Sequence, residues 1–484
     1  MPNCTTLIRS VLVADGSGRS PEIADVGLDH GRIVSIGNLR DWNAQNTFDG
    51  DGKVLAPGFI DVHTHDDTSV VRTPEMLPKL SQGVTTVVVG NCGISAAPVQ
   101  LRGEPPDPMN LLGEAGAFRY PTFAAYVEAI AAARPAVNVA ALVGHTALRS
   151  NHMDRLDRSA TDAEIQAMRC QLQEALDHGA AGLSTGLAYL SAFSASTEEV
   201  MGLAEPLAAA GAIYTTHMRS ETETILQAMD EVVRIGKHAR VPVLISHLKC
   251  AGIANWGRSA EVLGWLDQAR QSQSIGCDCY PYAAGSSTLD LRQVDERVKI
   301  QITWSKAHPE KAGQTLAQIA EAWGVQQMEA ARHLQPAGAI YHSIAEDDMQ
   351  AILRHPGTMI GSDGLPNDPL PHPRLWGTFT RVLGRYCREQ HLFPLGEAVR
   401  KMTSLPALQF GLVDRGWIRE GYYADLVLFD PATVRDVATF DDPVRLSEGI
   451  EAVWVNGSLS YRNQAATHHR AGRFLPRKHL ASRQ

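Results

Sequence analysis

The sequence predicts an α/β protein: a (β/α)8 TIM-like barrel, with a small β-sandwich built from both chain ends and an insertion after strand 7. Three observations support this architecture. Apolar, strand-like runs alternate with helical patterns eight times along the chain. Short β-rich runs separated by turns occupy both ends. The connection between the seventh and eighth runs is much longer than an ordinary loop.

The eight strand-like runs define the barrel. They cover residues 59–65, 84–90, 137–145, 180–186, 213–217, 242–247, 275–282 and 358–363. Helical patterns lie between them: residues 162–178 precede Gly179, a residue type that commonly ends a helix, and residues 222–238 show a similar pattern. Because repeated β-α units build a parallel sheet, we expect residues 58–409 to form the catalytic barrel.

The two chain ends show a different sequence pattern, with short strand-like runs separated by turns. Strand-like runs occur at residues 6–14, 23–37 and 53–56, and similar runs return at 421–429 and 453–457. We expect residues 1–57 and 410–484 to pair into one β-sandwich domain. Residues 286–340, which lie in the long connection after the seventh run, are expected to form an inserted subdomain or lid.

Composition narrows the class of protein. The 484 residues include 44% hydrophobic and 20% charged residues, which is typical of a globular enzyme. A net charge of -9 without a basic stripe argues against nucleic acid as a partner. The start lacks a secretory pattern and no apolar run reaches about 18 residues, so we expect a cytoplasmic protein with no membrane partner. Seven scattered cysteines suggest reduced thiols, and no pattern indicates an oligomeric state.

Polar residues that close the strand-like runs predict a metal site. His63 and His65 are two residues apart on the first run and therefore point to the same side. The second, fifth, sixth and eighth runs end at or near Cys92, His217, His247 and Asp363. Barrel enzymes place their active sites at these strand ends, and imidazole with thiolate suits Zn²⁺. Taken singly, each residue has a structural alternative, such as a hydrogen-bonded core histidine or a packed cysteine.

Several motifs extend this pattern along the chain. They are Pro57-Gly-Phe-Ile-Asp-Val-His-Thr-His-Asp66, Gly90-Asn-Cys-Gly-Ile-Ser95, Thr216-His-Met-Arg-Ser-Glu221, Ser246-His-Leu-Lys249, Asp278-Cys-Tyr-Pro-Tyr282 and Gly361-Ser-Asp-Gly-Leu-Pro366. With them the chain resembles the amidohydrolase superfamily, and specifically its D-aminoacylase (N-acyl-D-amino-acid deacylase) family, over essentially its whole length. The resemblance implies one tight zinc on Cys92, His217 and His247. It implies a second, weaker metal position framed by His63, His65 and Asp363.

The resemblance also implies hydrolysis of a linear amide, which releases a carboxylate and a free D-amino acid. Zinc can lower the pKa of bound water toward about 7 and polarise the carbonyl, so that a zinc-bound hydroxide attacks. Asp363 is expected to act as general base and then as general acid. A helix N-cap is the structural alternative for Asp363. His145 closes the third run and is either a substrate donor or a structural residue, so it stays outside the predicted catalytic set.

Cationic and hydroxyl side chains near the strand ends are candidates for binding the substrate carboxylate. By resemblance these are Lys249, Tyr282 and Arg374, for which a solvated side chain is the alternative. Ser287 and Arg292 follow the seventh run, and a buried arginine there would bind a second carboxylate through its planar fork. Within the family that the chain resembles, Ser-His-His-Lys is associated with a preference for hydrophobic residues, whereas this chain has Ser246-His-Leu-Lys249. This difference and Arg292 favour N-acyl-D-glutamate, with hydrophobic D-residues as the second choice.

Other functions are consistent with a histidine-bearing barrel. A hydantoinase or dihydropyrimidinase would open a cyclic amide, but such enzymes normally carry a lysine on the fourth strand, where this chain reads Gly182-Leu-Ser-Thr-Gly-Leu-Ala188. A nucleobase or nucleoside deaminase fits poorly with the cysteine ligand and the candidate carboxylate binders. A non-catalytic scaffold with this fold would be expected to have lost ligands, whereas every predicted ligand is present here.

Overall fold

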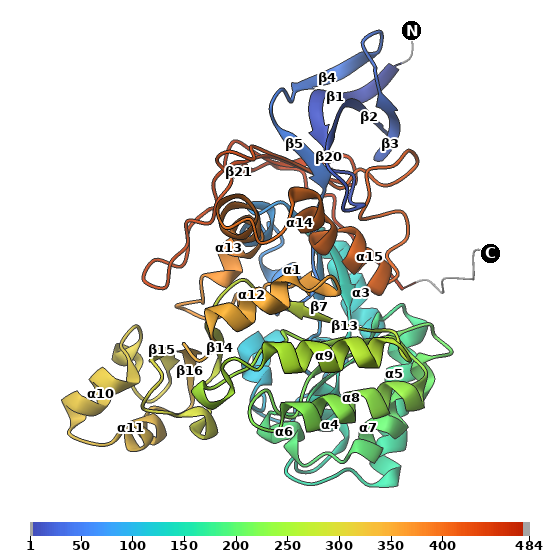
Figure 1. The fold of residues 1–484 in the computed structure, drawn as a ribbon. Coiled ribbons are helices and arrows are strands. Elements are labelled where there is room, and N and C mark those ends of the chain that lie inside the picture. Colours follow the sequence, from blue (N-terminus) through green and yellow to red (C-terminus); the bar gives the residue numbers. More distant parts are fainter. Residues whose placement is uncertain (1–2, 478–484) are drawn as a thin grey trace.

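The computed structural model describes residues 3–477, and the predicted barrel lies at its centre (Figure 1). Its parallel strands are β6 (Phe59–Asp61), β7 (Val84–Val89), β8 (Asn138–Ala141) with β9 (Val143–Gly144), β10 (Gly182–Gly186), β11 (Ile213–His217), β12 (Val243–Ile245), β13 (Ile275–Cys279) and β17 (Thr358–Ile360). Every residue of β7 is buried, as expected for a parallel strand covered on both faces. Backbone hydrogen bonds from Asp363 N to His63 O (2.7 Å) and from His65 N to Gly364 O (3.0 Å) join the first and last strands. The predicted α/β barrel is confirmed.

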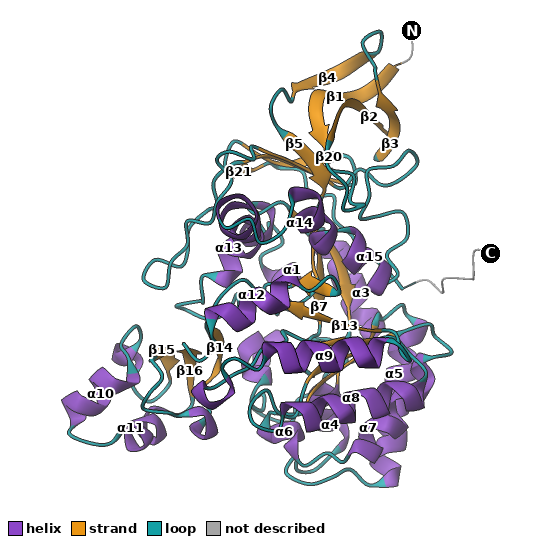
Figure 2. Ribbon diagram, viewed as in Figure 1, coloured by secondary structure: helices purple, strands orange, loops and turns teal. Residues whose placement is uncertain are grey.

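Helices surround this sheet (Figure 2). They are α1 (Ser69–Arg72), α2 (Leu77–Leu80), α3 (Phe123–Ala133), α4 (His145–His152), α5 (Asp162–Asp177), α6 (Leu190–Phe193), α7 (Thr197–Ala204), α8 (Ile225–Ala239), α9 (Ser259–Arg270), α12 (Glu346–Arg354), α13 (Arg374–Arg381), α14 (Leu395–Met402) and α15 (Ser404–Gln409). The start of α5 is fixed by a capping box, in which Thr161 accepts from Glu164 N and Glu164 accepts from Thr161 N. The helix therefore begins where the sequence pattern places it.

Both chain ends join one nine-stranded sheet. Its strands are β1 (Asn3–Val13), β2 (Glu22–Asp29), β3 (Arg32–Gly37), β4 (Asn43–Asp49), β5 (Val54–Pro57), β18 (Leu426–Phe429), β19 (Ile450–Val455), β20 (Ser458–Arg462) and β21 (Ala465–Ala466). Antiparallel pairing of β5 with β18 connects the two ends. Trp454 is 1% exposed and packs edge-on against Phe48, with ring centroids 5.0 Å apart. The two ends therefore share a hydrophobic core of their own.

The long connection after β13 forms a small unit that projects beside the barrel (Figure 1). It contains an antiparallel sheet of β14 (Gly285–Thr288), β15 (Ile300–Ser305) and β16 (Ala337–Tyr341), with helices α10 (Leu316–Trp323) and α11 (Gln327–Leu334). These elements bury a separate apolar cluster. Because β14 begins shortly after the carboxyl end of β13, the unit starts at the same end of the barrel as the predicted site.

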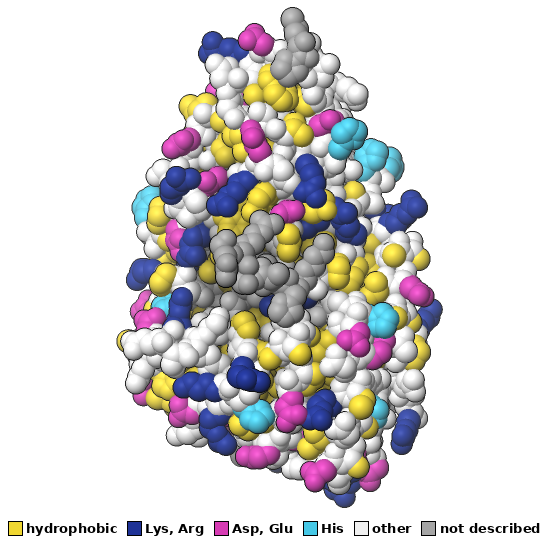
Figure 3. Space-filling model, turned by 90° about the vertical axis from the view of Figure 1, so that its right-hand side faces the viewer, with side chains coloured by type: hydrophobic (Ala, Val, Ile, Leu, Met, Phe, Trp, Pro, Cys, Tyr) yellow, Lys and Arg dark blue, Asp and Glu magenta, His cyan; other side chains and the backbone are white. Residues whose placement is uncertain are grey.

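The surface of the molecule carries charges of both signs. On the face shown in Figure 3, Lys and Arg side chains are interspersed with Asp and Glu side chains. Within residues 3–477, no helix combines the length and the apolar character needed to cross a membrane.

Candidate active site

A cavity of about 420 Å³ lies at the carboxyl ends of the barrel strands. Its lining includes six residues predicted from the sequence: His217, His247, Lys249, Ser287, Arg292 and Asp363. A larger cavity, of about 630 Å³, lies beside Arg72 and Tyr120 and contains none of the predicted site residues. The predicted site residues therefore line the smaller of these two cavities.

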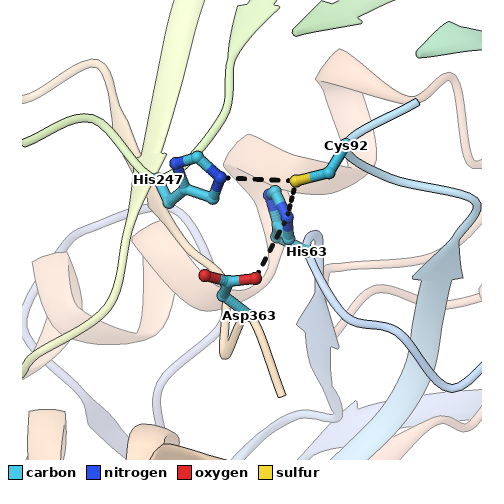
Figure 4. A group of neighbouring side chains, drawn as sticks. All are labelled: His63, Cys92, His247 and Asp363. Carbon is cyan, nitrogen blue, oxygen red and sulfur yellow. Dashed lines mark hydrogen bonds and ion pairs between the residues drawn. The ribbon is translucent and has the colours of Figure 1, made fainter. Parts of the chain in front are cut away.

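Four predicted ligands converge at the wall of this cavity (Figure 4). His63, Cys92, His247 and Asp363 offer ligand atoms that all lie within 4.8 Å of one another. Cys92 Sγ is 3.2 Å from His63 Nε2 and 3.3 Å from His247 Nε2. Asp363 Oδ1 is 3.5 Å from His63 Nε2. Side chains from the first, second, sixth and eighth strand ends thus meet at one point.

The remaining two histidines flank this group. His65 Nε2 lies 3.2 Å from Asp363 Oδ1, and the ring of His217 lies against that of His247, with centroids 4.5 Å apart. The Nδ1 atoms of His65 and His217 are buried without a hydrogen-bond partner in the described part of the chain. All six predicted metal ligands are therefore close together, and two of their donor atoms have no protein partner.

The charges of these buried groups match a cation site. Burial opposes ionisation of Cys92, but His63 and His247 hold the pKa of the thiol well below its ordinary value. Burial likewise opposes a charge on Asp363, yet Arg374 and the neighbouring histidines hold the pKa of this carboxyl well below its usual range. A buried thiolate and carboxylate need nearby positive charge. The sulfur, nitrogen and oxygen donors together fit Zn²⁺.

The backbone turns sharply at three of these residues. Cys92, His247 and Asp363 have φ angles of 53°, 35° and 48°, in the left-handed region that non-glycine residues rarely adopt. Each lies two or three residues beyond the end of its strand, β7, β12 or β17. Asp278 on β13 supports two of the histidines, accepting from His247 N at 3.0 Å and contacting His63 Nδ1 at 3.4 Å. The strand ends thus aim the side chains inward at some conformational cost.

Glu221 is a site residue that the sequence analysis did not select. It follows β11, lines the cavity, and accepts from Lys249 Nζ at 2.6 Å. Its Oε1 also lies 2.9 Å from His247 Nδ1. Lys249 and the neighbouring histidines hold the pKa of this carboxyl well below its usual value in spite of burial. Its position as the last residue of the Thr216–Glu221 motif was the available signal.

Arg292 lines the cavity, but it is not the buried arginine that the sequence suggested. Its side chain is 43% exposed. Nε and Nη2 bind the carboxylate of Asp290, and Nη2 also donates to Ala188 O at 2.8 Å. The Nε–Nη2 edge of the guanidinium, which was expected to hold a substrate carboxylate, is thus occupied by the carboxylate of Asp290. Nη1 makes no hydrogen bond among the described residues.

Tyr282 and Arg374 do not line the cavity. Strand β13 ends at Cys279, three residues earlier than expected, so Tyr280 faces the cavity while the Tyr282 hydroxyl contacts Pro373 O at 3.5 Å. Arg374 is fully buried behind Asp363, with Nη1 2.9 Å from Asp363 Oδ2. The structure therefore places Arg374 where it orients Asp363 rather than at the cavity surface.

The positions of Asp363 and His145 decide between the functional and structural roles that the sequence left open for them. Asp363 does not cap a helix, because the next helix, α13, begins after Pro373. His145 lies outside the cavity lining, and its Nε2 is 3.0 Å from Glu199 Oε1 in a buried pair.

Tyr189, after β10, is a second cavity residue that the sequence pattern did not indicate. It lines the cavity, its ring packs against His217, and its hydroxyl is 3.5 Å from Ser287 Oγ.

Comparisons with known proteins show the family to which this chain belongs. A family model described as "Amidohydrolase family" matches residues 46–461. Three relatives from Alcaligenes xylosoxydans xylosoxydans cover 96–97% of this chain: a D-aminoacylase (50% identical, 97% of its length), an N-acyl-D-aspartate deacylase (47%, 94%) and an N-acyl-D-glutamate deacylase (47%, 95%).

Solved structures give the same result. A D-aminoacylase superimposes with a TM-score of 0.96 at 49% identity, over 98% of this chain and 100% of that one. The N-acyl-D-glutamate deacylase of Bordetella bronchiseptica, complexed with zinc and a phosphonate inhibitor, gives a TM-score of 0.94 at 46% identity with the same coverage.

Proposed function

Since this chain belongs to the amidohydrolase family, and within it to the D-aminoacylases, we propose that it hydrolyses N-acyl-D-amino acids, with N-acyl-D-glutamate as the preferred substrate. The products are a carboxylate and a free D-amino acid. One observation carries the proposal: His63, Cys92, His247 and Asp363 converge on one point at the wall of a cavity. The missing lysine on β10 argues against the cyclic-amide alternative.

Zinc is the metal that suits this set of donors. We assign the tight position to Cys92, His217 and His247, and a weaker second position to His63, His65 and Asp363. When bound, zinc would make water acidic near neutral pH and polarise the scissile carbonyl. The solved relative complexed with zinc and a phosphonate inhibitor supports the choice of metal.

The side chains of the chain perform the remaining tasks. Asp363 faces the cavity and is held from behind by Arg374, so its carboxylate is placed to take a proton from the attacking water. The same carboxyl then delivers this proton to the leaving amine. Tyr189 presents a hydroxyl to the cavity and is placed to donate a hydrogen bond to the substrate.

Substrate recognition requires positive charge for carboxylates. Lys249 lines the cavity beside His247, which places its ammonium group where it can bind the α-carboxylate. Ser287 and Arg292 line the same cavity and belong to the inserted unit. The free Nη1 of Arg292 is a suitable donor for the side-chain carboxylate of D-glutamate.

Turnover of matched substrates tests the proposal. We expect zinc-loaded protein to hydrolyse N-acetyl-D-glutamate fastest, then N-acetyl-D-leucine and N-acetyl-D-aspartate, and to leave N-acetyl-L-glutamate and hydantoin unchanged. Release of free amino acid is measured alongside zinc content. Hydrolysis of hydantoin without turnover of any N-acyl-D-amino acid would reject the reaction class. A faster reaction with D-leucine would reject only the side-chain preference.

A further inference from the structure

Glu221 contacts the outer edges of two histidines of the site. Its Oε1 lies 2.9 Å from His247 Nδ1, and its Oε2 lies 3.6 Å from His217 Nε2. The opposite nitrogen of His247, Nε2, lies 3.3 Å from Cys92 Sγ. The opposite nitrogen of His217, Nδ1, is buried and has no hydrogen-bond partner among residues 3–477. In each ring, Glu221 therefore contacts one nitrogen and leaves the other available.

Direct metal binding by Glu221 is the alternative explanation. Glu221, His217 and His247 do offer ligand atoms within 4.8 Å of one another. However, Lys249 Nζ lies 2.6 Å from Glu221 Oε1 and 2.8 Å from His247 Nδ1. An ammonium group already occupies the position beside this carboxylate oxygen, and it would repel a metal cation placed there.

We propose that Glu221 is a positioning residue, whose two carboxylate oxygens hold the rings of His247 and His217 so that each ring presents its other nitrogen to the metal. Partners at the outer nitrogen of a metal-binding imidazole fix the orientation of the ring and tune the affinity for the metal. Because both oxygens of one carboxylate are used, Glu221 also fixes the two rings relative to each other. This inference rests on the proposed zinc site.

Glu221 has a second consequence through Lys249. The same Oε1 contacts both His247 and Lys249, and the Glu221 side chain is only 12% exposed. The histidine pair and the cation assigned to the substrate carboxylate therefore share one acceptor. Removing the negative charge releases Lys249 as well as the histidines, so substrate affinity and metal affinity change together.

Zinc affinity tests the inference without relying on turnover. The zinc dissociation constant is measured by competition with a chromophoric chelator for the wild type, Glu221→Gln and Glu223→Gln. Glu223 is the matched control, because it is an exposed glutamate two residues further along the same loop. We expect Glu221→Gln to weaken zinc binding by about 10- to 100-fold, and Glu223→Gln to have no effect. In the cobalt-substituted protein, the thiolate-to-metal absorption of Cys92 should shift only in Glu221→Gln.

The possible outcomes separate the two claims. A Glu221→Gln protein that binds zinc as tightly as Glu223→Gln would overturn the positioning role. A wild-type protein that binds no zinc would instead overturn the proposed function. If Glu221→Gln does not fold, Glu221→Asp replaces it, since a shorter carboxylate should still weaken zinc binding. Wild-type affinity in that variant would equally contradict the inference.

Discussion

At the scale of single residues, Cys92 brings a sulfur donor to the candidate site. A thiolate is a softer donor than a carboxylate or a carbonyl, and it favours zinc over magnesium or calcium. Its sulfur contacts both His63 and His247 and lies buried at 1% exposure. Without the sulfur, these histidines lose their shared partner.

We therefore expect Cys92→Ala to lose the tightly bound zinc and to lower kcat/KM by more than about 100-fold, a larger loss than for residues that only support ligands. Metal analysis and initial rates check this. Cys170→Ala is the control, because Cys170 is a free, exposed cysteine on α5. Full zinc and full rate in Cys92→Ala would refute the ligand assignment.

Arg292 is expected to affect specificity rather than the reaction itself. Arg292→Ala should lower kcat/KM for N-acetyl-D-glutamate by about 10- to 100-fold more than for N-acetyl-D-leucine, since one charge-assisted hydrogen bond contributes about 1.5–3 kcal/mol. Arg297→Ala is the control, because Arg297 binds Asp295 with the same Nε and Nη2 geometry and lies outside the cavity lining. Equal losses for both substrates in Arg292→Ala would exclude a role in side-chain recognition.

At the scale of elements, a buried ammonium group links the first and last barrel strands. Lys79, on α2, is 0% exposed, and its Nζ lies 2.8 Å from Asp61 Oδ2 and 3.1 Å from Asp66 Oδ2. It also donates to Thr64 Oγ1 at 2.9 Å and to Ser362 Oγ at 3.0 Å. These contacts surround the His63–His65 segment and the turn that carries Asp363.

Removing this ammonium group leaves two carboxylates buried together. We expect Lys79→Met to lower the free energy of unfolding by about 3–5 kcal/mol, as for other broken buried ion pairs. Urea denaturation measures the change. Lys53→Met removes a half-exposed partner of Glu451 and should cost no more than about 1 kcal/mol. A loss of that small size in Lys79→Met would show that the network does not stabilise the barrel.

The inserted unit meets the barrel at a titratable contact. Thr303, on β15, donates to Asp368 Oδ2 at 2.7 Å, and burial raises the pKa of the Asp368 carboxyl to about 6. The folded state therefore holds this proton more tightly than the unfolded state, whose pKa is about 3.9. The resulting stabilisation is complete below about pH 4 and is lost as the pH rises through about 6.

Asp368→Asn should remove this pH dependence. We expect the variant to gain stability relative to the wild type as the pH rises from about 4 to about 6, and to keep a constant advantage above that range. Thermal unfolding across this range measures the difference. A constant difference between the two proteins at every pH would contradict the assigned titration.

At the scale of the whole molecule, both chain ends close one sheet, and no strand of that sheet lines the catalytic cavity. Trp454→Ala should create a cavity in its core and lower the free energy of unfolding by about 3–5 kcal/mol, with kcat/KM at 25 °C unchanged. Trp256→Ala, at a site 44% exposed, should cost much less. An equal cost for the two tryptophans would show that the sheet is not a tightly packed core.

The barrel and the convergence of the candidate metal ligands could be predicted because both depend on local patterns. Buried parallel strands read as apolar runs, and polar residues that end such runs share one face of the barrel. The positions beyond the strand ends could not be predicted in the same way. The run that predicts the seventh strand continues to Tyr282, but Pro281 cannot donate a ladder hydrogen bond and the strand ends at Cys279, so Tyr280 faces the cavity instead. Glu221 and the Asp290–Arg292 pair depend on loop conformations that apolar periodicity does not encode.

The left-handed backbone at Cys92, His247 and Asp363 has a consequence for attempts to make the protein resist heat. Glycine adopts this conformation without the steric penalty that other residues experience, which is of the order of 1 kcal/mol at each position. Relief of backbone strain alone would therefore favour glycine at all three places, but at Asp363 it would leave the buried Arg374 guanidinium without its carboxylate, at a cost of about 3–5 kcal/mol. A screen for heat resistance is thus expected to keep Asp363 for its ion pair, whereas retention of Cys92 and His247 also requires that the screen score turnover.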